Sequence, residues 1–313
     1  MKATGTEGRK KALAQARRET SDYLAYLRDV RRVSSQTIRS YGADLEGFVA
    51  WCEREGTDPI NASRLQLRRY VSDMVSAGYA DVSINRKLTT LRTFYRWLES
   101  HDKIAVSEAE SIPGRKTAKT LPLAMSDEEV SRMIDACDDE TTVGLRDHAF
   151  IELLYATGAR ISEMAQLEPA DIDFSQGEVR LFGKGSKERI VPVYARALEV
   201  TSTYLAKARP TLVRAAKKGP HATAVFVSKN GNNMSDVTLR RRFELLVKKA
   251  GLEHPYTPHA MRHTYATELL SGGADLKAVQ ELLGHESLVT TQIYTHLSIE
   301  RLKEATKQAH PRG

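Results

Sequence analysis

Hydrophobic residues recur every three or four positions over most of residues 21–102, which is the spacing of one face of an α-helix. Four such stretches follow one another, and polar residues or glycines separate them. Their apolar positions lie within residues 23–27, 38–52, 65–74 and 84–98. Four helices of this length predict a small helical bundle at the start of the chain.

The helical pattern fails between Asp102 and Met125, where proline, glycine, lysine and threonine are frequent. That composition is typical of a linker between domains. The residues before about Thr20 are mainly polar and basic. We therefore expect a flexible N-terminus over residues 1–20, a helical domain over 21–104, a linker over 105–124 and a second domain over 125–313.

The second domain is predicted to be mostly helical with a small β-sheet, so the fold class is α+β and mainly α. Ser126 and Glu129 form the capping box of its first helix, and Gly158 ends the next one. Apolar residues on both sides of a Gly-Lys-Gly-Ser-Lys turn predict a β-hairpin over residues 177–193. The apolar run AVFVS predicts a further strand at residues 224–228. Further helices are expected over residues 194–208 and from residue 236.

The composition indicates which kinds of binding partner and which cellular compartment to expect. The net charge of +7 favours a polyanionic partner, although a basic, solvated surface explains it equally well. Two cysteines are too few for a disulfide framework or a cysteine-rich zinc site, so we expect a reduced, cytoplasmic protein. No run approaches eighteen apolar residues, and no signal peptide is visible, so no membrane association is expected.

A candidate phosphate site lies at the start of a predicted helix near the C-terminus. Thr257 is a suitable N-cap, and Pro258 suits the first helical position. His259 and Arg262 then lie three residues apart and share one face of that helix. Because free N–H groups and the positive end of the helix dipole gather there, this end of the helix suits a phosphate group.

Two further residues of this region can converge on the same group. A helix over residues 275–283 stops at Gly284, with His285 next, and Ser287 can cap a short helix that carries Tyr294. A tyrosine with arginine and histidine, but without a carboxylate cluster, indicates covalent phosphoryl transfer without a metal ion.

The sequence favours neither a metal site nor an ATP-binding loop, because part of the required motif is absent in each case. His259 and His263 have the spacing of metal ligands on a helix, but the glutamate of an H-E-x-x-H motif is absent. Lys184 follows a glycine in the hairpin turn, but glycine also follows it, so the G-x-x-x-x-G-K-[ST] of an ATP-binding loop is absent. We expect neither a metal nor another cofactor.

Residues 257–297 resemble the C-terminal signature of the tyrosine recombinases: H-x-x-R, then G-H, then a tyrosine nine residues after that histidine. The segments GADLKAVQELLGH and TTQIYTHL most resemble the Xer branch of that family. Upstream, ATGARISE resembles the segment that carries the family's first catalytic arginine. The resemblance implies a catalytic set, in chain order, of Arg160, Lys184, His259, Arg262, His285 and Tyr294. Tyr294 would be the nucleophile, and Glu163 would support the site.

The resemblance also implies an architecture. A helical, SAM-like core-binding domain would precede a tyrosine-recombinase catalytic domain, and the two would close on DNA as a C-shaped clamp. A C-terminal exchange helix would dock onto a neighbouring subunit. The residues expected to contact the DNA backbone are Arg39, Arg86, Lys87, Lys187 and Arg189. For the first three, an ordinary solvated surface stays an equal alternative.

The function implied is site-specific DNA recombination through a 3′-phosphotyrosine intermediate, by a homo- or hetero-tetramer on two double-stranded DNA sites. Resolution of chromosome dimers, and so chromosome partition before cell division, is the first biological interpretation. A second Xer-type recombinase and a DNA translocase stay open as partners. The alternatives are the integrase of a phage or transposon, a type IB topoisomerase, and a basic DNA-binding protein without catalysis.

Overall fold

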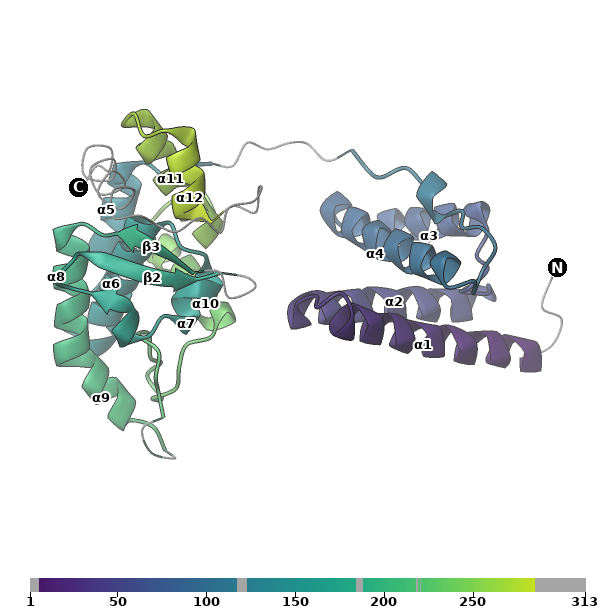
Figure 1. The fold of residues 1–313 in the computed structure, drawn as a ribbon, viewed down its shortest axis with the longest axis horizontal. Helices are drawn as coiled ribbons and strands as arrows, with labels where there is room; N and C mark the ends of the chain where they lie inside the picture. The colour runs from purple at the N-terminus through teal and green to yellow at the C-terminus, as the bar shows by residue number, and fades with distance from the viewer. Residues whose placement is uncertain (1–5, 117–122, 184–187, 218, 220, 285–313) are drawn as a thin grey trace. The chain divides into compact units, whose positions relative to one another are not determined.

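A computed structural model describes residues 6–116, 123–183, 188–217, 219 and 221–284 (Figure 1). The chain divides into two compact units, Met1–Lys119 and Thr120–Gly313, and each has its own hydrophobic core. The clamp arrangement of the two units stays a prediction. Within the described part of the chain, no helix has both the length and the apolar character needed to cross a membrane.

The first unit contains the predicted bundle of four α-helices. They are α1 (Thr6–Asp29), α2 (Ser35–Glu55), α3 (Arg64–Ser76) and α4 (Asp81–Ser100), followed by the short 3₁₀ helix η1 (Ala109–Ser111). Aromatic side chains form much of the core, where Phe48 lies edge-on to Tyr70. Local signals set the boundaries. Ser63 caps α3 reciprocally with Gln66, and Gly56 ends α2 in the left-handed conformation.

The first unit is longer than the periodicity predicts at both ends. Helix α1 begins at Thr6 rather than near residue 21, because Ala16 is buried in the bundle and Glu19 pairs with Lys103. At the other end, Ala109 and Ile112 are buried in the same core. The first part of the predicted linker therefore packs with the helical domain. Of residues 7–20 only Ala16 and Glu19 are buried, and one alanine with one glutamate is too weak a periodic signal to show this in the sequence.

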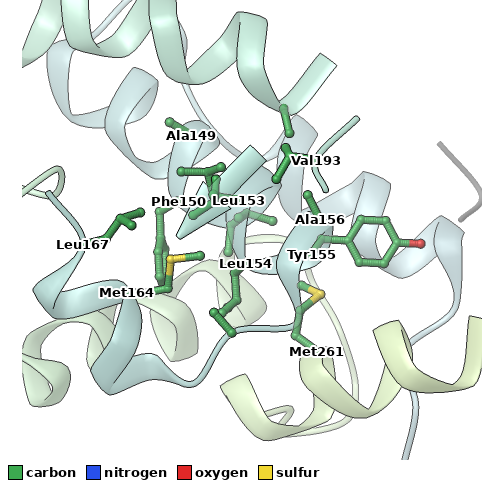
Figure 2. Packing of buried hydrophobic residues seen from close by; sticks show 14 of the residues in the cluster. Ala149, Phe150, Leu153, Leu154, Tyr155, Ala156, Met164, Leu167, Val193 and Met261 are labelled. Atoms are coloured by element: carbon green, nitrogen blue, oxygen red, sulfur yellow. The ribbon is translucent and has the colours of Figure 1, made fainter. Parts of the chain in front are cut away.

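The second unit is built around one buried helix, α6. The helices before the sheet are α5 (Asp127–Asp135), α6 (Thr142–Thr157) and α7 (Ile161–Gln166), and a 3₁₀ turn η2 (Pro169–Asp171) follows them. Helix α6 is buried on all sides over most of its length, as a central helix must be. Figure 2 shows its apolar side chains packed with Met164, Val193 and Met261, which come from three other segments.

The sheet has three antiparallel strands in the order β1-β2-β3: β1 (Ile172–Asp173), β2 (Glu178–Phe182) and β3 (Glu188–Pro192). The predicted hairpin is thus confirmed, with Val179 opposite Val191. Strand β1 was not predicted, because two residues show no periodicity. The strand predicted at residues 224–228 is wrong: among the described residues this segment makes a single bridge, Val227 to Asn233. Its side chains are buried, and an apolar run indicates burial whether or not a strand forms.

The remaining helices enclose the sheet and α6. They are α8 (Ala195–Thr203), a π-helical turn η4 (Tyr204–Ala208), α9 (Arg209–Arg214), α10 (Asp236–Lys249), α11 (Pro258–Ser271) and α12 (Leu276–Leu283). In Figure 1, α11 and α12 lie side by side, and α12 lies beside β3. The mainly α fold with a small sheet is therefore confirmed. In this fold the C-terminal ends of α6 and α12 lie together with the first residues of β3.

Candidate active site

The first candidate arginine stands at a sharp change of chain direction. Helix α6 ends at Gly158, whose φ of +55° lies in the left-handed region, and Arg160 is the N-cap of α7. The carboxylate of Glu163 accepts the backbone N–H of Arg160 at 2.8 Å and its Nη1 at 2.9 Å. The side chain of Arg160 keeps 42% of its surface exposed. Glu163 thus holds an arginine that solvent or a ligand can reach.

The second candidate arginine, Arg262, is buried where three helices end. It lies on the second turn of α11, and its Nη1 donates to the carbonyl of Gly158 at 2.8 Å. Its Nη2 donates to the carbonyl of Leu283 at the end of α12. Arg160 reaches the adjacent carbonyl, that of Gly284, at 2.9 Å. The predicted pair is therefore brought together, from positions far apart in the sequence.

A third arginine completes this cluster, and it contradicts a prediction. Arg189 on β3 donates from Nη1 and Nη2 to the two oxygens of Glu163 at 2.8 and 2.7 Å, and from Nε to the carbonyl of Leu282 at 2.7 Å. Only 5% of its side chain is exposed. A contact with the DNA backbone, as predicted for Arg189, does not fit this geometry, because all three of its nitrogens already donate within the protein.

The cluster combines three guanidinium groups with one carboxylate. Burial opposes ionisation of Glu163, but Arg189 and Arg160 outweigh it and hold the pKa of this carboxyl below its ordinary value. Burial, together with the charges of Arg160 and Arg189, lowers the pKa of Arg262 to about 10. These arginines therefore carry more positive charge than Glu163 balances. A bound anion such as a phosphate would relieve that excess.

His259 lies in the first turn of α11 and is exposed. The helix begins as predicted, with Pro258 at its first position, but the Thr257 side chain makes no capping hydrogen bond. His263, one turn further on, is half-buried. Across the described ranges, no three histidine, cysteine, aspartate or glutamate side chains gather as metal ligands would.

Four predicted residues, Lys184, Lys187, His285 and Tyr294, lie outside the described residues. Three of these positions directly adjoin described residues. Gly183 and Glu188 border the segment with both lysines, and Gly284, which Arg160 contacts, directly precedes His285. The roles of these four residues stay predictions.

The first unit has a polar cluster of its own. Asp44 on α2 is buried, and it pairs with Arg86 and with Lys87 at 3.1 Å on α4. The side chain of Arg86 is about half exposed, whereas that of Lys87 is largely covered. Arg39 is exposed and donates to Gln36 at 2.8 Å. Asp44 was missed from the sequence, where it is one acid among 40 and lies far from its two partners.

Models of known protein families match both units of the chain. The model of the phage integrase family matches residues 124–301, and that of the phage integrase N-terminal SAM-like domain matches residues 21–102. The chain belongs to the phage integrase family. This confirms the resemblance to the tyrosine recombinases that the motifs indicate, as well as the SAM-like character of the first domain.

Curated relatives of this phage integrase family member lie in the Xer branch. The chain is 39% identical over 292 residues to tyrosine recombinase XerC of Myxococcus xanthus, covering 93% of this chain and 97% of the relative. It is 37% identical over 294 residues to tyrosine recombinase XerD of Listeria monocytogenes, covering 93% and 98%.

Solved structures share the fold of the chain. The XerH site-specific recombinase bound to a palindromic difH substrate has a TM-score of 0.66 and 24% identity, covering 92% of this chain and 84% of that one. A lambda integrase dimer bound to a COC′ core site has a TM-score of 0.63 and 17% identity, covering 92% and 76%. At these identities the likeness concerns the fold alone.

Proposed function

We propose that this chain is a site-specific recombinase that cleaves and rejoins double-stranded DNA through a 3′-phosphotyrosine bond to Tyr294. The observation that carries the proposal is the meeting of Arg160 and Arg262 at the end of α12. Two arginines with unbalanced positive charge are suited to the non-bridging oxygens of one phosphodiester. Membership of the phage integrase family supports the choice of Tyr294 as nucleophile, because this tyrosine stands nine residues after the G-H motif in the sequence.

In the proposed cleavage step, the Tyr294 hydroxyl oxygen attacks the phosphorus, and the bond from phosphorus to the 5′-oxygen breaks. A phenol with a pKa near 10 needs a proton acceptor at neutral pH, and His259, exposed at the start of α11, is suited to this role. Lys184 would protonate the leaving 5′-oxygen. The released 5′-hydroxyl of the partner duplex would reverse the step and rejoin the strands.

Charge develops on the non-bridging oxygens as the bond breaks. Arg160 and Arg262 would stabilise it with planar, bidentate donors, and His285 would add a hydrogen bond. Loss of one such donor should slow cleavage by about 10²–10³-fold. Because the phosphotyrosine keeps the energy of the broken bond and the arginines supply the positive charge, the proposed reaction uses neither a metal ion nor a nucleotide.

The relatives named XerC and XerD support a role of the Xer type. We propose that the protein acts as a tetramer on two DNA sites and resolves chromosome dimers in the cytoplasm before cell division. A solved relative is a lambda integrase tetramer bound to a Holliday junction. In covalent trapping, tight sequence-specific binding without a covalent band would indicate that a second recombinase or a DNA translocase is also required.

Covalent trapping tests the proposal. The protein is mixed, in EDTA and without nucleotide, with nicked duplexes that represent candidate sites from its own chromosome, and is then denatured and run on a gel beside Tyr294→Phe. We expect a retarded protein–DNA band with the unaltered chain and none with the variant.

Each other outcome has a defined meaning. A band that persists in Tyr294→Phe would exclude this nucleophile, and a band that requires Mg²⁺ would exclude metal-free cleavage. Cleavage and relaxation of any plasmid regardless of sequence would indicate a topoisomerase. Salt-sensitive binding to any DNA, without a covalent band on any site, would favour a DNA-binding protein without catalysis.

A further inference from the structure

Arg189 lies on the buried face of the sheet, where an apolar side chain is expected. It lies on β3 opposite Leu181, and its inward-facing neighbour along the strand is Val191; both of these residues are buried. A buried guanidinium is costly unless every part of it is paired. Each of its three nitrogens donates to Glu163 or to the carbonyl of Leu282, so its geometry is fully determined.

The partner of Arg189 is the carboxylate that orients Arg160. Oε1 of Glu163 accepts one bond from Arg189 and one from the Arg160 side chain, at 2.8 and 2.9 Å. Oε2 accepts one from Arg189 and one from the Arg160 backbone, at 2.7 and 2.8 Å. The bidentate pair with Arg189 therefore fixes the plane of the carboxylate. Without it, a carboxylate on the short helix α7 could turn, and Arg160 would turn with it.

Arg189 also supports the end of α12. The carbonyls of Leu282, Leu283 and Gly284 accept hydrogen bonds, in that order, from Arg189, Arg262 and Arg160. A helix ends with partial negative charge on such carbonyls, so three cations stabilise this end. Gly284 packs closely on Arg189, since a Cβ there would lie 3.3 Å from its Nη1. The residue after Gly284 is His285.

We infer that Arg189 is a positioning residue for strand cleavage, which holds Glu163 against Arg160 and fixes the end of α12 ahead of His285. The inference rests on the proposed function. Arg189 is too buried to meet a phosphate itself, whereas Arg160 is exposed. The roles in the cluster therefore differ: Arg160 meets the phosphate through its exposed side chain, Arg262 is assigned to the phosphate by its place in the H-x-x-R motif, and Arg189 positions Glu163 and the end of α12.

The test compares the rate of cleavage with the affinity for DNA. Arg189→Gln and Arg189→Lys are assayed for single-turnover cleavage on saturating nicked DNA and for the Kd of the same duplex. We expect both variants to cleave about 10- to 100-fold more slowly with a nearly unchanged Kd, as is typical when a residue that orients a catalytic group, but does not contact the substrate, is removed. Lysine should not rescue the rate, because one ammonium group cannot replace a donor pair plus Nε. The matched control is Arg180→Gln, which removes the same charge from an exposed position of β2.

A double variant separates positioning from stability. If Arg189 acts through Glu163, then Arg189→Gln combined with Glu163→Gln should cleave no more slowly than the slower single variant. The double variant also removes both members of the Glu163–Arg189 pair, so neither is left as a lone buried charge, and it serves as the folded comparison if a single variant unfolds. Thermal unfolding of every variant is measured alongside.

Three results would overturn the inference. The first is wild-type cleavage by folded Arg189 variants, and the second is a slow rate that merely follows the folded fraction. The third is a rate loss in the double variant that equals the product of the two single losses. Absence of covalent product from the unaltered chain is a different failure, because it removes the proposed function itself.

Discussion

At the scale of single residues, the site depends on where one carboxylate lies. Glu163 is almost fully buried, yet its ion pairs with Arg189 and Arg160 keep its pKa below the ordinary value. Arg189, which its sequence context suggests as a DNA contact, is its strongest partner. Exposure separates Arg160 from Arg189, because 42% of the Arg160 side chain reaches solvent whereas all three nitrogens of the covered Arg189 donate within the protein.

The lowered pKa of Glu163 predicts how stability depends on pH. A carboxyl whose pKa is lower in the folded than in the unfolded chain adds stability above its unfolded pKa, about 4.5, and this is lost as pH falls through the folded pKa. Glu163→Gln should therefore be less stable than the unaltered chain at pH 7, and the difference should shrink as the pH falls below 4.5. Urea unfolding at pH 7, 5 and 4 measures this.

Glu199→Gln is the control for that series, because Glu199 pairs with Arg196 on the surface and both side chains are more than half exposed. It should change the stability little at any of these pH values. A Glu163→Gln deficit that stays constant with pH would show that the lost packing, rather than the charge, is responsible.

At the scale of elements, the turn from α6 into α7 places the first arginine. Gly158 adopts a positive φ there, and its carbonyl accepts a hydrogen bond from Arg262. The ring of Tyr265 on α11 packs directly on the glycine, so a Cβ would lie only 2.4 Å from its Cδ1. Two requirements therefore meet at this position: the backbone conformation and the close approach of a buried ring.

Gly158→Ala should destabilise the protein more than Gly177→Ala, which is its matched control. Both glycines have positive φ, +55° and +69°, but the nearest atom to a Cβ at Gly177 is 3.6 Å away. The extra cost at Gly158 should be about 1–3 kcal/mol, which is typical of overpacking. Chemical denaturation of both variants measures it. Equal losses would mean that Tyr265 moves aside freely and that only the backbone conformation matters.

At the scale of the whole molecule, two separate cores imply two folding units. The first core contains aromatic residues from α1, α2, α3 and α4, and the second surrounds α6. Three of the predicted DNA contacts, Arg39, Arg86 and Lys87, lie in the first unit, whereas Lys187 and the predicted catalytic set lie in the second. The first unit can therefore be tested for DNA binding apart from the predicted chemistry.

Residues 1–119 should fold alone. The expected result is a helical circular dichroism spectrum with one cooperative unfolding transition, because the core of this unit contains only its own residues. The fragment should bind duplex DNA weakly, with an affinity that falls as salt rises, and should form no covalent product. A non-cooperative transition would show that the second unit is needed to stabilise the bundle.

The sequence by itself determined the features that are encoded within a few residues. Helical periodicity predicted the bundle, the capping box of Ser126 and Glu129 set the start of α5, and Gly158 set the end of α6. The order of the motifs predicted the family, including the arginines Arg160 and Arg262. Such signals survive in the sequence because the interacting groups are separated by one or two helical turns.

Only the tertiary structure decided which distant groups meet. Arg189, Glu163 and Leu282 come from three elements, and nothing local to β3 shows that its arginine points inward onto a carboxylate. The pairing of Asp44 with Arg86 and Lys87 is of the same kind. A sequence shows the sign of each charge, but the packing of the chain determines its partner, its burial and therefore its role.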